Sequence, residues 1–332
     1  MYFLHFPYEK IIGQLDLALD QLAHHDEDLD RFALMLVDNA VEIALHKHAW
    51  GNAPINSWPE PGQKGNQGDF RKKVQLAKTT GIISLETEES INFLHELRNS
   101  SYHRGRSYKR VIHSLTIFYF KVACKLLQDH RPLFISTSSE LPYRAAKYLG
   151  DVALPAPLPY PEQLSAAKKY FGVAWERLIK AADALRSDLR NDLVQDMTKT
   201  IYDAHEMIEF LAGRPSKENR KEAVKDVMAE CFAWSPEAKE CAVELGFAKP
   251  GEDFEPLKFA VFLMTKDKFP GSHDPIPQWK TRLNSLKNKQ NDQNAAVKKY
   301  FTFMEDTEKT RANLSNLYEP AYESLRANAQ KN

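Results

Sequence analysis

Apolar residues recur at helical spacing along most of the chain, and no stretch keeps the strict alternation of a half-buried strand. In residues 8–25 the leucines and isoleucines fall largely on one side of a helix. Residues 29–50 are apolar around most of the helical circumference, which predicts a helix at the centre of a bundle. We therefore expect an all-α fold.

A polar stripe interrupts this central predicted helix at intervals of seven, four and four residues: Arg31, Asp38, Glu42 and His46. Such spacing keeps the four side chains on one side of the helix. The stripe faces either solvent or a polar cleft, because polar groups buried without partners are unfavourable. Asp38 and Glu42 are therefore candidate supporting residues of a site, and a solvated or helix-packing stripe is the alternative.

Proline and glycine divide the rest of the chain. Residues 51–68 are expected to form a loop, followed by helices over 69–78, from about Ser84 to Leu97, and over 107–129. Alternating prolines at 155, 157, 159 and 161 mark a boundary, because they are incompatible with a helix. Seven further helices are predicted at 162–189, 191–212, 217–233, 236–246, 255–266, 277–289 and 293–327. The predicted domains are a helical bundle (1–131), a proline-rich linker (132–161) and a second helical domain (162–332).

Charge is balanced overall but not locally. The 332 residues include 45 Lys or Arg and 45 Asp or Glu, yet the segment 98–131 has eight basic residues against one acid, Asp129. Such a segment can attract polyanions. The three cysteines lack CxxC spacing, which favours free thiols in a reducing, cytoplasmic setting. We expect no signal peptide, because the first residues lack a basic region followed by a long apolar one, and no membrane partner, because even the most apolar run, 111–127, is too short to span a bilayer.

The densest group of reactive side chains lies between the helix ending near Leu97 and the one starting near Ser107. It reads Arg98-Asn99-Ser100-Ser101-Tyr102-His103-Arg104-Gly105. An arginine offers a planar fork of donors to phosphate oxygens, and histidine transfers protons near neutral pH. Arginine followed after four to six residues by histidine occurs twice, the second time as Arg106 and His113, but Asn follows the arginine only at Arg98.

Residues 8–130 resemble the HEPN family of small helical bundles, whose ribonuclease members carry Arg, four to six residues, then His, often with Asn directly after Arg. The likeness rests on four helices, the polar stripe on the second, and the Arg98-Asn99-x-x-x-His103 motif before the last. It implies a HEPN-like antiparallel bundle and an endoribonuclease that cleaves RNA by transesterification, without metal or cofactor. It also implies a homodimer with a composite active site, and a toxin or anti-phage abortive-infection effector.

We expect Arg98, Asn99 and His103 to be catalytic. Arg104, Arg106 and Tyr102 are candidate substrate-binding residues, with Asp38 and Glu42 in support. Five residues of continuous helix turn through about 500°, which leaves the Arg98 and His103 side chains about 140° apart. Either the helix breaks near Ser100 or two chains contribute to one site.

Two other functions stay open. One is an inactive helical module that binds RNA or nucleotide or mediates assembly. The other is a metal-dependent hydrolase that uses His46, His48, Asp38 and Glu42. Residues 162–332 carry no assignable motif and are expected to sense a trigger, bind substrate or regulate the enzyme, with a regulatory partner protein as a further expectation.

Overall fold

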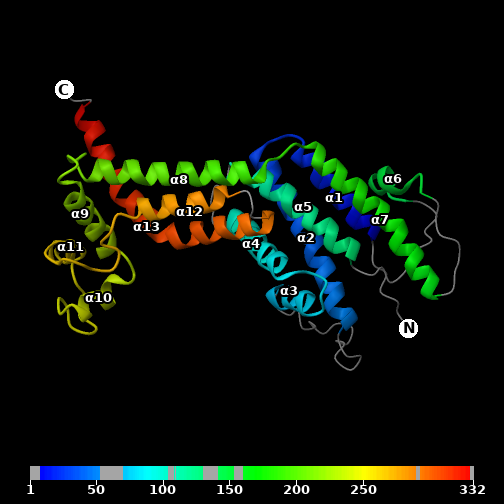
Figure 1. The fold of residues 1–332 in the computed structure, drawn as a ribbon, viewed down its shortest axis with the longest axis horizontal. Helices are drawn as coiled ribbons and strands as arrows, with labels where there is room; N and C mark the ends of the chain where they lie inside the picture. The colour runs from blue at the N-terminus through cyan, green and yellow to red at the C-terminus, as the bar shows by residue number, and fades with distance from the viewer. Residues whose placement is uncertain are drawn as a thin grey trace. The chain divides into compact units, whose positions relative to one another are not determined.

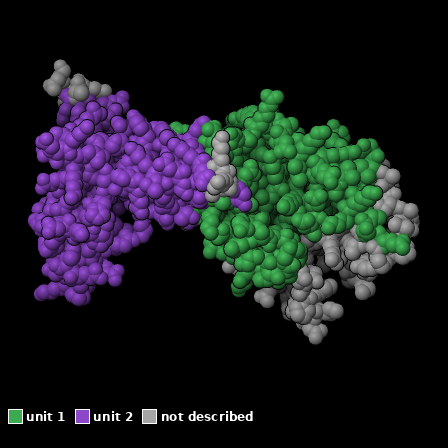
Figure 2. Space-filling view, viewed as in Figure 1, with its two compact units in different colours: residues 1–192, 293–298 green, residues 193–292, 299–332 purple. Residues whose placement is uncertain are grey.

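The computed structural model describes residues 8–52, 70–103, 108, 110–129, 141–152, 160–288 and 292–329. Within these residues there are thirteen helices and no strands, which confirms the all-α prediction (Figure 1). The chain forms two compact units (Figure 2). Unit 1 comprises residues 1–192 and 293–298, and unit 2 comprises residues 193–292 and 299–332. Each unit is thus assembled from two separate segments of the chain.

Unit 1 is built around α2, which contacts α1, α3, α4 and α5 (Figure 1). The side of α2 that carries Leu34, Val37 and Val41 is fully buried or nearly so, as the apolar circumference of this stretch predicts. Tyr119 and Phe120 of α5 are likewise buried. The helices of this unit are α1 (Tyr8–Leu22), α2 (Glu27–Asn52), α3 (Phe70–Thr79), α4 (Leu85–His103), α5 (Ile112–Asp129), α6 (Tyr143–Leu149) and α7 (Tyr160–Ala184).

Local hydrogen bonds explain where two of these helices begin. The Asp26 carboxylate accepts the backbone N–H groups of Asp28 and Leu29 at 3.0 and 3.1 Å, so it caps α2. The Ser84 hydroxyl accepts the backbone N–H of Thr87 at 3.2 Å and caps α4 in the same way. Both starts follow from short-range sequence, because aspartate and serine satisfy N–H groups that have no partner within the helix.

The helix α7 belongs to unit 1, although it follows the proline-rich segment. It packs on α1 and α5, and the Tyr8 ring of α1 stacks on Phe171 with centroids 4.7 Å apart. Trp175 of α7 is buried against the same tyrosine at 5.9 Å. The compact units thus divide the chain at residue 192, whereas the sequence suggested 132–161, because the long apolar face of α7 is covered by the first bundle.

A short helix, α6, lies inside the predicted linker; residues 130–140 and 153–159 of that region lie outside the described residues. Asp16 of α1, only 1% exposed, accepts hydrogen bonds from Arg144 at 2.5 Å, Lys147 at 2.8 Å and Tyr148 at 2.7 Å. These contacts join residues more than 120 positions apart in sequence. Sequence patterns missed α6 because its anchor is this tertiary contact.

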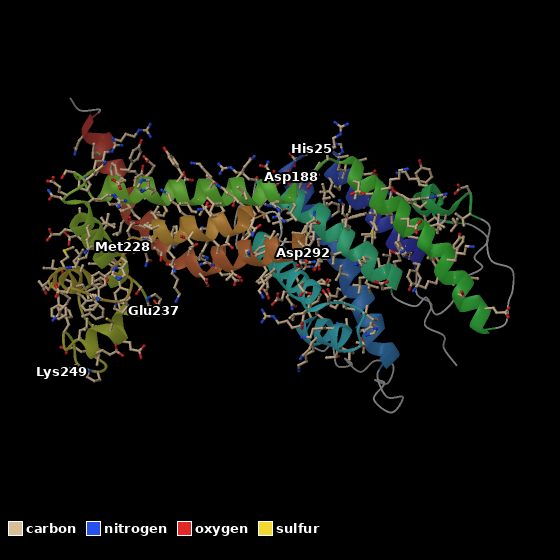
Figure 3. The ribbon with its side chains drawn as sticks, in the orientation of Figure 1. His25, Asp188, Met228, Glu237, Lys249 and Asp292 are labelled. Atoms are coloured by element: carbon tan, nitrogen blue, oxygen red, sulfur yellow. The ribbon has the colours of Figure 1, made fainter. Side chains whose placement is uncertain are left out.

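Unit 2 contains α9 (Arg220–Ala233), α10 (Ala238–Glu244), α11 (Pro256–Met264) and α12 (Ile276–Lys287), with most of α8 (Leu189–Leu211) and α13 (Gln293–Ala329). Asp188, labelled in Figure 3, accepts the backbone N–H of Asn191 at 3.1 Å as α8 begins. Arg220 links the carboxylates of Glu209 and Asp274 at 2.8 and 2.7 Å. A cluster of aromatic rings joins the residues after α10 to α11: Phe247, Phe254, Phe259 and Phe262.

Two further sequence expectations concern the cysteines and membrane-spanning helices. Cys124, Cys231 and Cys241 are all free, as their sequence spacing predicts, and all three are buried. In the described part of the chain, no helix combines the length and the apolar character needed to cross a bilayer.

Candidate functional site

The polar stripe of α2 does not lie in one environment. Arg31, near the start of the helix, pairs with Glu27 at 2.5 Å and Asp28 at 3.4 Å on its own helix. Asp38, two turns later, is completely buried. Since an ionised carboxylate is stable inside a protein only when it is paired and hydrogen-bonded, the partners of Asp38 define the candidate site.

Side chains from two other helices converge on Asp38. The Tyr119 hydroxyl of α5 donates to Asp38 Oδ1 at 2.8 Å. His95 Nδ1 of α4 lies 3.1 Å from both carboxylate oxygens. Arg98 Nε, also on α4, lies 3.6 Å from Oδ2, an ion pair slightly too long for a direct hydrogen bond. One buried carboxylate therefore holds a tyrosine, a histidine and an arginine together.

The spacing on α4 explains why His95 and Arg98 reach the same carboxylate. Residues three apart lie on one face of a helix, on successive turns. Leu94 and Leu97, at most 1% exposed, pack the neighbouring face into the core. The Phe70 ring at the start of α3 then stacks on the His95 imidazole, with centroids 3.7 Å apart and planes 10° from parallel. The imidazole is thus held on one edge by Asp38 and on one face by Phe70.

Arg98 joins this buried network to the protein surface. Its Nε is buried and has no hydrogen-bond partner among the described residues, while its side chain as a whole is 31% exposed. Nη1 donates to the Asn99 side-chain oxygen at 2.9 Å. Because a guanidinium carries five N–H donors, this arrangement leaves donors available to an anion such as a phosphate. Asn99 orients the arginine in this structure.

Tyr119 is a permanent hydrogen-bond donor in this network. Burial raises the pKa of its hydroxyl well above the ordinary value, and the neighbouring Asp38 charge raises it further. The charge of Glu42, one turn after Asp38 on α2, acts in the same direction, and that of Arg98 opposes it. The phenol therefore stays protonated at any physiological pH and keeps Asp38 Oδ1 occupied.

The helix α4 continues to His103, so there is no break near Ser100. The Ser100 hydroxyl simply donates to the Leu97 carbonyl oxygen at 3.0 Å within the helix. Arg98 and His103 therefore sit on one continuous helix, at positions about 140° apart around its axis. The side chains of Tyr102 and His103, and the whole of Arg104 and Arg106, lie outside the described residues.

His48, at the other end of α2, has a different environment. His48 is buried, and its Nε2 lies 2.8 Å from the Thr80 hydroxyl. Burial lowers the pKa of the His48 imidazole, because it disfavours the charged form of the ring. Among the residues that the structure describes, no three or more His, Cys, Asp or Glu side chains are grouped in a way that could hold a metal ion.

His113, the partner of Arg106 in the second Arg–His spacing, has a separate set of contacts. Its Nδ1 lies 2.9 Å from the buried Asp30 of α2, and its ring packs on His25 with centroids 4.6 Å apart. Asp30 and Asp38 lie eight residues apart on α2. Each of these carboxylates therefore has its own histidine, and His113 is not part of the Asp38 group.

Sequence reasoning missed two residues of the candidate site, Tyr119 and His95, and His95 lies close to the Arg–His motif. The motif extends from Arg98 toward the C-terminus, whereas His95 precedes it by three residues. The signal that finds it is helical spacing, because a residue three positions before Arg98 shares its face. Its carboxylate partner is brought near only by the packing of α4 on α2.

Comparisons of this chain with protein-family models, with curated proteins and with solved structures find no match. The chemistry of the Asp38 group therefore has to be inferred from its own residues and geometry.

Proposed function

We propose that the chain is a HEPN-type, metal-independent endoribonuclease that acts as a homodimer, in the role of a toxin or an anti-phage abortive-infection effector. The observation that carries the proposal is Arg98. A buried carboxylate anchors its inner nitrogen, Asn99 orients its head, and the guanidinium reaches the surface five residues before His103. An anchored and partly exposed arginine is suited to phosphate recognition.

The reaction would need three contributions. The ribose 2′-oxygen attacks the adjacent phosphorus and loses its proton to a base, and the leaving 5′-oxygen gains a proton from an acid. Arg98 would stabilise the negative charge that builds up on the phosphate oxygens, and His103 would transfer a proton. The products are a 2′,3′-cyclic phosphate and a 5′-hydroxyl.

Two further features support RNA as substrate and a dimer as the active form. Arg110 and Lys125, in the segment with few acids, are exposed. The continuity of α4 favours a site completed by a second copy of the chain, since Arg98 and His103 occupy positions about 140° apart around one helix.

Cleavage of single-stranded RNA by the purified protein tests the proposal. We expect cleavage that persists in the presence of a chelator and falls by about 10²-fold or more in Arg98→Ala and in His103→Ala, because each removes phosphate stabilisation or proton transfer. Gel analysis of the RNA and of its 3′ ends measures both rate and product. Arg326→Ala and His24→Ala are matched controls, since both residues are exposed and lie outside the site.

Other outcomes would assign a different function. Equal cleavage by wild type, Arg98→Ala and His103→Ala would show that Arg98 and His103 are not catalytic. Activity abolished by the chelator would favour a metal-dependent hydrolase. The remaining candidate is a catalytically inactive module that binds RNA or nucleotide or mediates assembly. One observation favours it: His95 and Arg98 both contact the buried Asp38, as side chains in a purely structural network would. The inactive module predicts intact RNA with every form of the protein.

A further inference from the structure

His95 is better placed than His103 to act beside Arg98 within one chain. Three residues of helix correspond to about 300°, so His95 and Arg98 lie about 60° apart around the helix axis, whereas the positions of Arg98 and His103 lie about 140° apart. His95 and Arg98 also contact the same carboxylate. A phosphate bound by the guanidinium of Arg98 would therefore lie near the imidazole of His95.

The contacts of His95 determine which ring nitrogen can act. Carboxylate oxygens accept hydrogen bonds, so the hydrogen shared with Asp38 is on Nδ1. The Tyr119 hydroxyl, which already donates to Oδ1, leaves Asp38 in the role of acceptor. No described residue forms a hydrogen bond with Nε2, and the His95 side chain remains 16% exposed. Nε2 is therefore the nitrogen free to take up and release a proton.

The surroundings of the ring hold it in a fixed position. Asp38 of α2 contacts the ring directly, Tyr119 of α5 and Arg98 of α4 contact the same carboxylate, and the charge of Glu42 on α2 acts on Tyr119. On α3, Phe70 covers one face of the imidazole, and the nearby Arg71 is paired with Glu96 at 3.1 Å. A carboxylate that holds the Nδ1–H of a histidine fixes its tautomer and stabilises the imidazolium that forms when Nε2 takes a proton from a hydroxyl.

We propose that Asp38 and His95 form a dyad that activates the ribose 2′-hydroxyl, with His95 Nε2 as the general base and Asp38 as its positioning residue; this inference rests on the proposed ribonuclease activity. The O2′ proton moves to Nε2, the O2′–P bond forms and the P–O5′ bond breaks. The 5′-oxygen takes its proton from His103 of the second copy of the chain. Exchange with solvent then returns both histidines to their starting states.

The variant His95→Asn separates a catalytic from a structural role. The asparagine amide nitrogen lies where Nδ1 of histidine does, so the donor to Asp38 is retained while Nε2 is lost. We expect the turnover number to fall by about 10²–10⁴-fold. A base must be unprotonated, so the wild-type rate falls at acidic pH, and we expect this acidic limb to vanish from the pH profile of the variant. His24→Asn, at an exposed histidine after α1, is the matched control. Thermal unfolding of each variant shows whether it is folded.

An RNA with sulfur in place of the bridging 5′-oxygen distinguishes the base from the acid, because a thiolate leaves without protonation. With this substrate His103→Ala should recover most of its activity, and His95→Asn should not.

If His95→Asn does not fold, an NMR experiment on the wild-type protein tests the proposal instead. A 2′-O-methyl RNA, which binds but cannot react, should shift the His95 ring resonances as well as those of His103.

Each result supports or overturns the dyad. If His103→Ala is inactive and His95→Asn cleaves at the wild-type rate with an unchanged pH profile, the ribonuclease proposal stands and the dyad fails. Recovery of His95→Asn on the sulfur substrate would make His95 an acid and overturn the assignment. His95 resonances that do not respond to the bound RNA would also overturn it. Wild-type protein that leaves RNA intact would refute both proposals.

Discussion

Asp38 shows how one residue can determine the arrangement of a site. Removing an ionised carboxylate from water is unfavourable by several kcal/mol, and only good partners compensate for it. Here the partners are a phenol at 2.8 Å, an imidazole at 3.1 Å and a guanidinium at 3.6 Å. The same contacts that make the buried charge tolerable also place His95 and Arg98 side by side.

The hydroxyl of Tyr119 provides a test of this network. Tyr119→Phe removes a donor from a fully buried carboxylate and leaves that lone pair without a partner, so we expect a loss of about 1–3 kcal/mol in the free energy of unfolding. Urea denaturation at neutral pH measures the change. Tyr143→Phe, at a tyrosine that is 85% exposed, should have no effect. A Tyr119→Phe protein as stable as wild type would mean that the hydroxyl is not needed to stabilise Asp38.

At the scale of helices, a second buried aspartate attaches α6 to the bundle. Burial by itself raises the pKa of the Asp16 carboxyl, but hydrogen bonds from Lys147, Tyr148 and Arg144 outweigh this effect, so the pKa lies below its ordinary value of 3.8. A carboxyl whose pKa is lowered in the folded state stabilises the protein above its unfolded-state pKa. That contribution is lost as the pH falls through the lower, folded-state pKa.

Substitution of Asp16 should therefore have a pH-dependent effect. At pH 7 we expect Asp16→Asn to lower the free energy of unfolding by about 1–3 kcal/mol, because the charge-assisted hydrogen bonds from Arg144 and Lys147 are weakened. The difference from wild type should shrink as the pH falls below about 4. Denaturation curves at several pH values measure it, with the exposed Glu218→Gln as control. A difference that stays constant down to pH 2 would contradict this account.

The helices themselves were predictable where local signals were sufficient. Apolar periodicity located α2, and the caps at Asp26 and Ser84 lie within three residues of the N–H groups that they satisfy. The site was predictable only in part. The motif indicated Arg98. The hydrogen bond between His95 and Asp38, however, joins residues 57 positions apart in sequence, and no local pattern specifies it.

On the scale of the whole molecule, the start of α13 is part of unit 1. The fully buried Ser90 hydroxyl of α4 donates to the Asn294 side-chain oxygen at 2.8 Å, and Lys298 pairs with Glu89 at 2.7 Å. These contacts lie at the opposite end of α4 from Arg98. A segment about 200 positions later in sequence thus completes the surroundings of the helix that carries the candidate site.

Loss of the hydrogen bond between Ser90 and Asn294 should lower the stability of unit 1, although Asn294 is distant from the rest of that unit in sequence. Asn294→Ala leaves the buried Ser90 hydroxyl without its acceptor, so we expect unfolding to be easier by about 1–3 kcal/mol. Hydrogen exchange should show the loss as faster exchange of α4 amides. Asn219→Ala is the control, because the Asn219 side chain forms no capping hydrogen bond at the start of α9. Unchanged exchange in α4 would show that Asn294 does not stabilise this helix.

The interleaved composition of the two units limits how the chain could have been assembled or can be re-engineered. Since residues 293–298 complete unit 1 and the chain then returns to unit 2, no single cut in the sequence separates one intact unit from the other. A gene fragment ending at residue 192 would encode the Asp38 group without the α13 residues that contact α4. Neither unit is therefore a cassette that recombination could transfer in one piece, and the two parts of this protein are expected to be inherited together.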